Sequence, residues 1–214
     1  MRIVGITGGT GSGKTTACDY IREKGFTIID FDKMARTLQK PGMPILMDYI
    51  REFGRGILLP NGTLDRKKFG QIIFTDAQKR AICDKMGIYH MDIVMDYIVR
   101  DFAAAGKGVT KETNPDDFLQ KKVIFLDAPT LFETKLKDMV DEAWVVDVDD
   151  ETRIQRIIER DGITRADVLK RMSAQMPREE KLRRANVVID NYGTVKQLCQ
   201  NIDKALSDLY ERVD

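Results

Sequence analysis

The chain has 214 residues, 43% of them hydrophobic, and its 35 basic residues nearly balance its 34 acidic residues. This length suits one domain with small insertions, and the near-zero net charge argues against a protein that binds nucleic acid or a membrane surface. No apolar segment is long enough to span a bilayer, and the first strand begins at Arg2, so we expect a cytoplasmic chain without a signal peptide. Its three cysteines have no metal-ligand spacing and should be reduced.

The first feature along the chain is a short apolar run, Arg2 to Thr7, that leads into Gly8-x-x-x-x-Gly13-Lys14-Thr15. Such glycines let the backbone N–H groups point inward as a cup for phosphate oxygens, while the lysine reaches the β- and γ-phosphates and the Thr hydroxyl can ligate Mg²⁺. Residues 14–24 lack Pro and Gly, so a helix should follow and place its positive N-terminus at the cup. The sequence therefore predicts a nucleotide-binding loop whose contacts come from Gly11, Ser12, Gly13, Lys14, Thr15 and Thr16.

This loop predicts binding of a nucleoside triphosphate but does not identify the reaction. The chain lacks the Asn-Lys-x-Asp of GTPases and the Gly-Gly-Gln of transporter ATPases. Asp141 and Glu142 precede an apolar run, whereas a metal-binding acid should follow its strand, so we expect these two acids to form a solvated turn. Small-molecule kinases remain as the class that fits.

Five short apolar runs predict the fold: Arg2 to Thr7, Phe26 to Asp30, Val123 to Asp127, Ala143 to Asp147 and Val187 to Asp190. Continuous apolar runs separated by helical stretches are typical of a parallel sheet covered on both faces. We therefore predict an α/β fold of the P-loop kinase type, with a five-stranded parallel sheet. Its strand-end acids should lie at the carboxyl edge, where ligands bind, although each could instead cap a helix.

Two stretches lie outside this sheet and define the expected domain organisation. One P-loop kinase domain would consist of a core (1–40, 121–150 and 186–214), a helical acceptor-binding insertion (41–120) and a lid (151–185). The insertion contains turns, helical sequence from Asp65 to Ala105 with one long amphipathic element from about Asp76, and a polar loop from Gly106 to Gln120. The lid segment is basic, and Arg156 and Arg160 are spaced i, i+4, so one helix face could close both guanidinium groups over a triphosphate. An exposed, salt-bridged helix pair is the structural alternative.

The chain resembles the dephospho-coenzyme A kinase family across nearly its whole length. The matching pieces are particular in combination, and they run in order along the chain: Thr7 to Thr16, Ile29-Asp30-Phe31-Asp32 with Arg36, Pro41-Gly42, Gly62 to Arg66, Ile73-Phe74, His90, Leu126 to Pro129 with Leu131-Phe132-Glu133, Val145 to Asp147, Arg156, Arg160-Asp161, Arg171 with Gln175-Met176-Pro177, and Val188 to Asn191.

The resemblance implies a phosphotransferase that uses ATP and Mg²⁺ to phosphorylate the ribose 3′-hydroxyl of dephospho-coenzyme A, with Lys14, Asp32 and Arg160 as its catalytic residues. Asp32 would be the general base, and its alternative role is a cap on a helix from Lys33 to Gln39. Asp30 would share a face with Asp32 in extended chain and could hold a water bound to Mg²⁺, or simply cap the strand end.

The acceptor's phosphates would meet basic side chains of the insertion. Arg36 and Arg66 suit this role because a guanidinium group grips phosphate in a bidentate manner. The resemblance implies that His90 also contacts these phosphates, although a lone histidine on a helix is more often a packed or surface residue than a ligand. Another small-acceptor kinase, for nucleosides or nucleotides, and a nucleotide-dependent switch or assembly factor remain alternatives. We expect small-molecule partners only, in a monomer or small homo-oligomer.

Overall fold

The structure is a computed structural model that describes residues 1–213. These residues divide into two compact units: one contains Met1–Asp30 and the chain from Ala105 onward, and the other contains Phe31–Ala104. The first unit carries the sheet and the phosphate-binding loop, and the second is helical.

The sheet of the first unit has five parallel strands in the order β2-β3-β1-β4-β5. The strands are β1 (Arg2–Thr7), β2 (Thr27–Asp30), β3 (Val123–Asp127), β4 (Glu142–Asp147) and β5 (Val187–Asp190). The predicted strands and the predicted α/β class are confirmed, with two boundaries shifted by one residue. β1 lies at the centre, which places the loop that follows it in the middle of the carboxyl edge.

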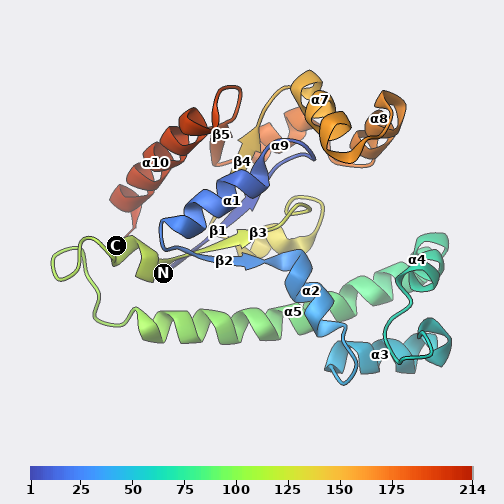
Figure 1. Cartoon of the computed structure of the whole chain (residues 1–214). Coiled ribbons are helices and arrows are strands. Elements are labelled where there is room, and N and C mark those ends of the chain that lie inside the picture. Colours follow the sequence, from blue (N-terminus) through green and yellow to red (C-terminus); the bar gives the residue numbers. More distant parts are fainter. Residues whose placement is uncertain (214) are drawn as a thin grey trace. The chain divides into compact units, whose positions relative to one another are not determined.

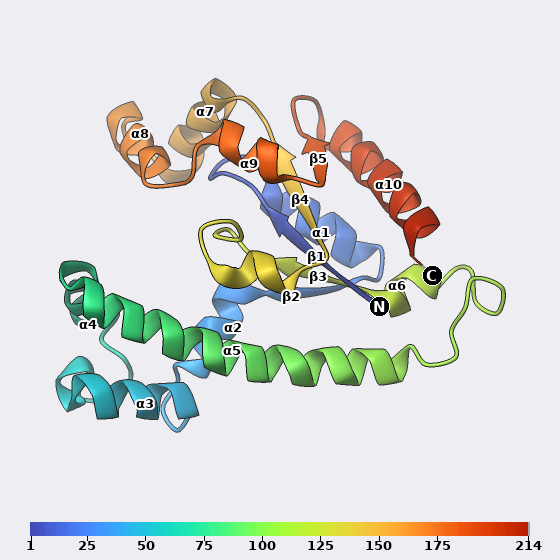
Figure 2. The same cartoon turned by 180° about the vertical axis from the view of Figure 1, so that it is seen from behind.

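Helices cover both faces of this sheet. α1 (Lys14–Glu23), α6 (Phe118–Lys122) and α10 (Val195–Arg212) bury apolar side chains on one face, around Phe125 and Trp144. α9 (Arg178–Arg184) lies over the other face, behind the sheet in Figure 1 and in front of it in Figure 2. Thr194 begins α10 with a reciprocal capping box to Gln197.

Between β4 and β5 lie α7 (Asp150–Asp161) and α8 (Arg165–Ser173), followed by α9. Asp149 caps α7 by accepting from the Thr152 N–H, and Gly162 ends the helix in a left-handed conformation. α7 and α8 share a small apolar cluster built around Ile154, Ile157 and Val168. This segment, predicted to be a lid, therefore has a core of its own.

The second unit contains α2 (Phe31–Leu38), α3 (Pro44–Phe53), a short 3₁₀ helix (Arg55–Ile57), α4 (Arg66–Thr75) and most of α5 (Ala77–Ala105). Its core includes three aromatic side chains in mutual contact, Tyr49, Phe53 and Phe69. Asp65 caps α4 by accepting from the Lys68 N–H at 3.0 Å. α4 ends at Thr75 and α5 begins at Ala77, which confirms the long helix predicted from about Asp76.

Two expectations about polar segments were wrong. Glu142 is not in a solvated turn: it begins β4, is buried, and accepts from the Arg212 guanidinium at 2.7 Å. The region 106–120 is not a polar loop throughout, because Phe118 and Leu119 begin α6 and enter the main core. In both cases contacts distant in sequence decide the outcome: Arg212 compensates the buried charge of Glu142, and the main core takes up Phe118 and Leu119.

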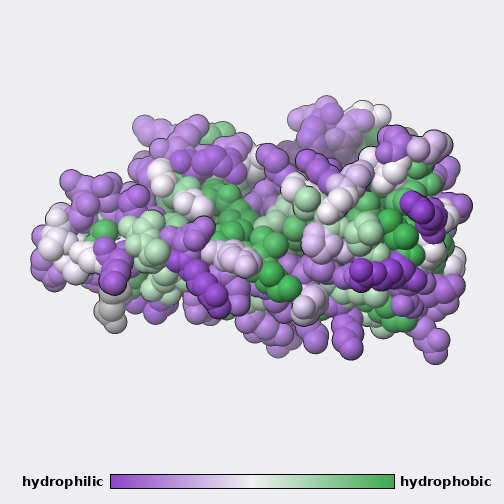
Figure 3. Space-filling model, turned by 90° about the horizontal axis from the view of Figure 1, so that it is seen from below, coloured by the Kyte–Doolittle hydropathy of each residue, from purple (hydrophilic) through white to green (hydrophobic). Residues whose placement is uncertain are grey.

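The surface is rich in hydrophilic side chains, as the 32% share of charged residues requires. The face drawn in Figure 3 is mainly hydrophilic, with hydrophobic residues gathered in patches. None of the helices within residues 1–213 combines the length and the apolar character that a membrane span requires.

Candidate active site

The predicted phosphate-binding loop joins β1 to α1 at the centre of the carboxyl edge. Gly13 precedes α1 with a positive φ of 89° and offers no side-chain cap, so the first N–H groups of the helix remain available to an anion. Ser12 is buried, and its backbone N–H donates to the Gly9 carbonyl at 3.0 Å. Of the loop residues predicted to bind nucleotide, Lys14, Thr15 and Thr16 form the first turn of α1.

The glycines of the loop also allow other elements to approach closely. A Cβ atom at Gly13 would overlap the Asn191 carboxamide, and one at Gly9 would overlap the Arg153 guanidinium. Asn191 follows β5 and donates to the Ser12 carbonyl at 2.7 Å, in a buried hydrogen bond. Arg153, from α7, donates to the Thr10 carbonyl at 2.9 Å. The loop is therefore held from outside by two segments that are distant in sequence.

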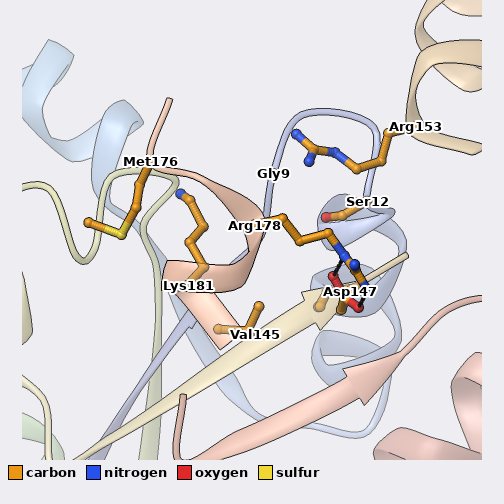
Figure 4. Close-up of a pocket in the computed structure, with 9 residues that line it drawn as sticks. Gly9, Ser12, Val145, Asp147, Arg153, Met176, Arg178 and Lys181 are labelled. Carbon is orange, nitrogen blue, oxygen red and sulfur yellow. Dashed lines mark hydrogen bonds and ion pairs between the residues drawn. The ribbon is translucent and has the colours of Figure 1, made fainter. Parts of the chain in front are cut away.

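Acidic side chains at the strand ends lie beside this loop, as predicted. Asp30 and Asp127 are direct partners in the register of β2 and β3. Asp127 forms an ion pair with the Lys14 ammonium group. Asp147, at the end of β4, is buried and forms two hydrogen bonds with Arg178, at 2.8 and 2.6 Å. Figure 4 shows this pair and, above it in the view, Arg153.

The paired arginines of the predicted lid have different partners. Arg156 donates to the Asn191 carbonyl at 3.2 Å, whereas Arg160 is exposed and pairs with Asp161 at 2.7 Å. Arg171 reaches the same carboxylate at 2.7 Å. Arg160, assisted by Arg171, holds the pKa of Asp161 below its usual range. α7 carries both arginines at the predicted i, i+4 spacing, and their closure over a triphosphate stays a prediction.

The predicted acceptor residues lie in the second unit. Arg36 is exposed in the last turn of α2, and Arg66 begins α4 and donates to the Gln39 carboxamide at 2.6 Å. His90 is half-buried in α5, with its Nε2 atom 2.7 Å from Asp48. These side chains therefore belong to three different helices of the unit.

The predicted geometry of Asp30 and Asp32 was wrong. Asp30 ends β2 and α2 begins directly at Phe31, so the two acids do not share a face of extended chain. Asp32 is exposed in the first turn of the helix, not before it, which also excludes the cap that was its structural alternative. A strand that passes into a helix without an intervening residue leaves no position for that cap.

Sequence reasoning did not select several residues that hold the loop or its lysine. The sequence could have indicated Asp127, because this residue ends an apolar run. It could also have indicated Arg153, because this residue is spaced i, i+3 from Arg156 on the same predicted helix. Gln175 and Asn191 carried none beyond the resemblance, because their contacts with Thr10 and Ser12 span 165 and 179 residues.

The profile of the family described as dephospho-CoA kinase matches residues 2–197. The chain belongs to the dephospho-CoA kinase family. A dephospho-CoA kinase of Carboxydothermus hydrogenoformans is 38% identical over 94% of this chain and 91% of its own. A dephospho-CoA kinase of Shouchella clausii is 37% identical over 97% of this chain and 98% of its own. One of Arabidopsis thaliana is 37% identical over 98% of this chain and 84% of its own.

Solved structures agree with this dephospho-CoA kinase fold. The crystal structure of TT1252 from Thermus thermophilus has a TM-score of 0.74 and 26% identity, and covers 97% of each chain. A dephospho-CoA kinase from Campylobacter jejuni has a TM-score of 0.64 over 98% of this chain and 97% of its own. The latter is 22% identical and is evidence for the fold only.

Cys18 lies near the loop of this dephospho-CoA kinase family member but is not suited to chemistry. It is buried in α1, and burial, together with the nearby Asp127 carboxylate, raises the pKa of its thiol to about 12. Because the thiolate is the nucleophile, this group should be inert at neutral pH. The expectation that Cys18 serves packing agrees with its place in the main core.

We therefore expect native Cys18 to resist alkylation at pH 8, where about 10⁻⁴ of the thiol would be ionised. Cys199 is half-buried and serves as the internal comparison. Iodoacetamide labelling followed by peptide mass spectrometry should modify Cys199 first and Cys18 only after unfolding in urea. Equal labelling rates in the native protein would contradict this assignment.

Proposed function

We propose that this protein transfers the γ-phosphoryl group of ATP to the ribose 3′-hydroxyl of dephospho-CoA and releases ADP and CoA, the last step of CoA synthesis. The observation that carries the proposal is the strand–loop–helix phosphate site in a chain that matches the family from residue 2 to 197. The cytoplasmic location and the monomer or small homo-oligomer expected from the sequence stay predictions.

On the nucleotide side, the backbone N–H groups at the start of α1 bind the phosphates of ATP. Lys14 exchanges its Asp127 partner for the β- and γ-phosphates, so its charge follows the group that is transferred. Phosphoryl transfer needs positioning and charge stabilisation rather than covalent chemistry from the protein, and a fixed cup with a mobile lysine provides both.

The residues beside the loop fit a Mg²⁺ ion that arrives with ATP. No group of three or more His, Cys, Asp or Glu side chains that could hold a metal occurs within residues 1–213. Mg²⁺ usually takes one or two protein oxygens, substrate phosphates and water. Thr15, with Asp127 or Asp30, would offer such oxygens. When bound, Mg²⁺ neutralises charge on the β- and γ-phosphates.

On the acceptor side, Asp32 accepts the proton of the ribose hydroxyl as the new bond forms. Arg36, Arg66 and His90 bind the phosphates of dephospho-CoA. Because Nε2 of His90 contacts Asp48, only its Nδ1 atom is left for the acceptor. Arg66 donates to Gln39 through one Nη atom, which leaves the other guanidinium N–H groups for a phosphate.

Residues 151–185 act as the lid. The buried Arg153 ties the start of α7 to the phosphate-binding loop, so the movable part begins beyond it and includes Arg160. Closure brings Arg156 and Arg160 to the triphosphate and excludes water, which would otherwise hydrolyse ATP.

The test of the proposed function is ADP release from ATP and Mg²⁺ with a panel of acceptors: dephospho-CoA, adenosine, nucleoside monophosphates and a buffer blank. Dephospho-CoA should give turnover far above the blank, and mass spectrometry should identify CoA. Lys14→Ala should abolish that turnover. Turnover with a nucleoside but not with dephospho-CoA would identify a different small-acceptor kinase and overturn the proposal.

Asp32→Asn should lower turnover by at least about a hundredfold, the low end for loss of a general base. The free energy of unfolding should fall by no more than about 0.3–1 kcal/mol, the value of one charge near a helix N-terminus. Steady-state kinetics and urea denaturation measure the two effects. The matched control is Asp96→Asn, an exposed aspartate on α5, which should leave both unchanged. Normal turnover in Asp32→Asn would exclude the base assignment.

Arg160→Ala should lower turnover by about a hundredfold or more, as loss of a charge-stabilising donor does elsewhere. The melting temperature should stay nearly constant, since an exposed ion pair contributes about 0–1 kcal/mol. Arg22→Ala is the control, because it removes an exposed arginine with its own ion pair outside the lid. Hydrogen exchange in residues 160–173 should slow when an ATP analogue and dephospho-CoA are bound together. An active Arg160→Ala enzyme with unchanged exchange would refute the lid.

A further inference from the structure

The side chain of Gln175 reaches the tip of the phosphate-binding loop. Its Oε1 atom accepts from the Thr10 N–H at 3.1 Å, and its Nε2 atom donates to the Thr10 hydroxyl at 2.8 Å. Gln175 lies in the short connection between α8 and α9, so this contact joins the base of the lid to the loop. Neither the sequence pattern nor the proposed chemistry assigns Gln175 a role.

With Gln175 in place, Thr10 has a partner for each of its polar groups. The third group, its carbonyl oxygen, accepts from Arg153 Nε at 2.9 Å. The two side chains come from either end of the lid segment, α7 on one side and the α8–α9 connection on the other. Thr10 is therefore the residue at which the lid holds the loop.

This contact leaves the phosphate donors available. The N–H groups that can receive an anion are those at the start of α1, from Lys14 onward, where the helix has no side-chain cap. Thr10 precedes them by four residues, and its N–H points to Gln175. Gln175 and a phosphate can therefore be bound at the same time, so Gln175 supports the loop and does not compete with the nucleotide.

The connection that carries Gln175 is itself anchored. The Met176 N–H donates to Glu133 at 3.3 Å, and Glu133 forms an ion pair at 2.8 Å with Lys181, whose side chain is 3% exposed. Arg178 pairs with Asp147 at the end of β4. Residues 175–181 thus contact the segments that follow β1, β3 and β4, as Figure 4 shows in part. An anchored backbone lets one carboxamide fix a loop at little entropic cost.

We propose that Gln175 is a positioning residue that holds Thr10, and through it the phosphate-binding loop, in the conformation that binds the phosphates of ATP. Gln175 does not touch the reacting atoms. The inference rests on the proposed function in that ATP is the ligand of the loop. Loss of the contact weakens ATP binding and leaves acceptor binding unchanged.

The test compares Gln175→Met, which keeps the approximate length and bulk, with Gln175→Ala. Both should raise the KM for ATP and the Kd for a non-hydrolysable ATP analogue about tenfold, as loss of two neutral hydrogen bonds can produce. The KM for dephospho-CoA should change by less than about twofold in both. Gln200→Ala is the matched control: its side chain is exposed on α10, outside the lid, and all constants should match wild type.

A double-mutant cycle with Thr10→Ala tests the contact itself. Thr10→Ala removes the hydroxyl partner of Gln175 and should raise the Kd for the ATP analogue less than Gln175→Met does. The double variant should bind no more weakly than Gln175→Met alone. Additive effects would mean that the two residues act independently and would overturn the proposal.

The outcomes separate this inference from the proposed function. Absence of dephospho-CoA phosphorylation by the wild type would refute the proposed function, while calorimetry with the ATP analogue would still decide the role of Gln175. Wild-type ATP binding in Gln175→Met would refute the positioning role. A fall in melting temperature with an unchanged Kd would show a structural residue only and would also refute it.

Discussion

The conformation of the loop between β1 and α1 is the constraint on which the rest of the site depends. A loop of glycines has little intrinsic preference for one shape, because glycine loses more conformational entropy on folding than any other residue. Hydrogen bonds from outside therefore define it. Asn191, which follows β5, donates a hydrogen bond to the Ser12 carbonyl. Arg153 and Gln175, both from the lid segment, form hydrogen bonds with the backbone of Thr10. The phosphate cup is thus a product of the whole first unit.

The same dependence governs the charges around the loop. Three basic groups of the first unit are paired with carboxylates: Lys14 with Asp127, Arg178 with Asp147, and Arg160 with Asp161. The Asp147 pair raises the pKa of Arg178 above its usual range. Under the proposed function, a triphosphate replaces some of these carboxylates, so each cation exchanges one anionic partner for another. Such an exchange avoids leaving a buried charge uncompensated, which would be costly.

The two units divide the proposed work. Under the proposed function, the first unit would bind the nucleotide at the carboxyl edge of its parallel sheet, while the second carries the predicted acceptor residues on α2, α4 and α5. Asp32 stands two residues beyond Asp30, which ends the first stretch of the first unit. Asp32, the proton acceptor of the proposed function, is joined to the end of β2 through Phe31. The last residue of β2, Asp30, is the register partner of Asp127.

The sequence by itself determined the strands, the loop from Gly8 to Thr15 and the placement of acids at one edge, because these depend on local apolar runs, glycine spacing and strand direction. Only the tertiary structure revealed the burial of Glu142, the entry of Phe118 into the core and the separation of Asp30 from Asp32 by the start of α2. It also selected Arg153, Gln175 and Asn191 as the residues that hold the loop. The physical reason is that a buried charge or a backbone held by side chains depends on partners far away in sequence, 70 residues for Glu142 and 143 to 179 for the loop, which no local pattern encodes.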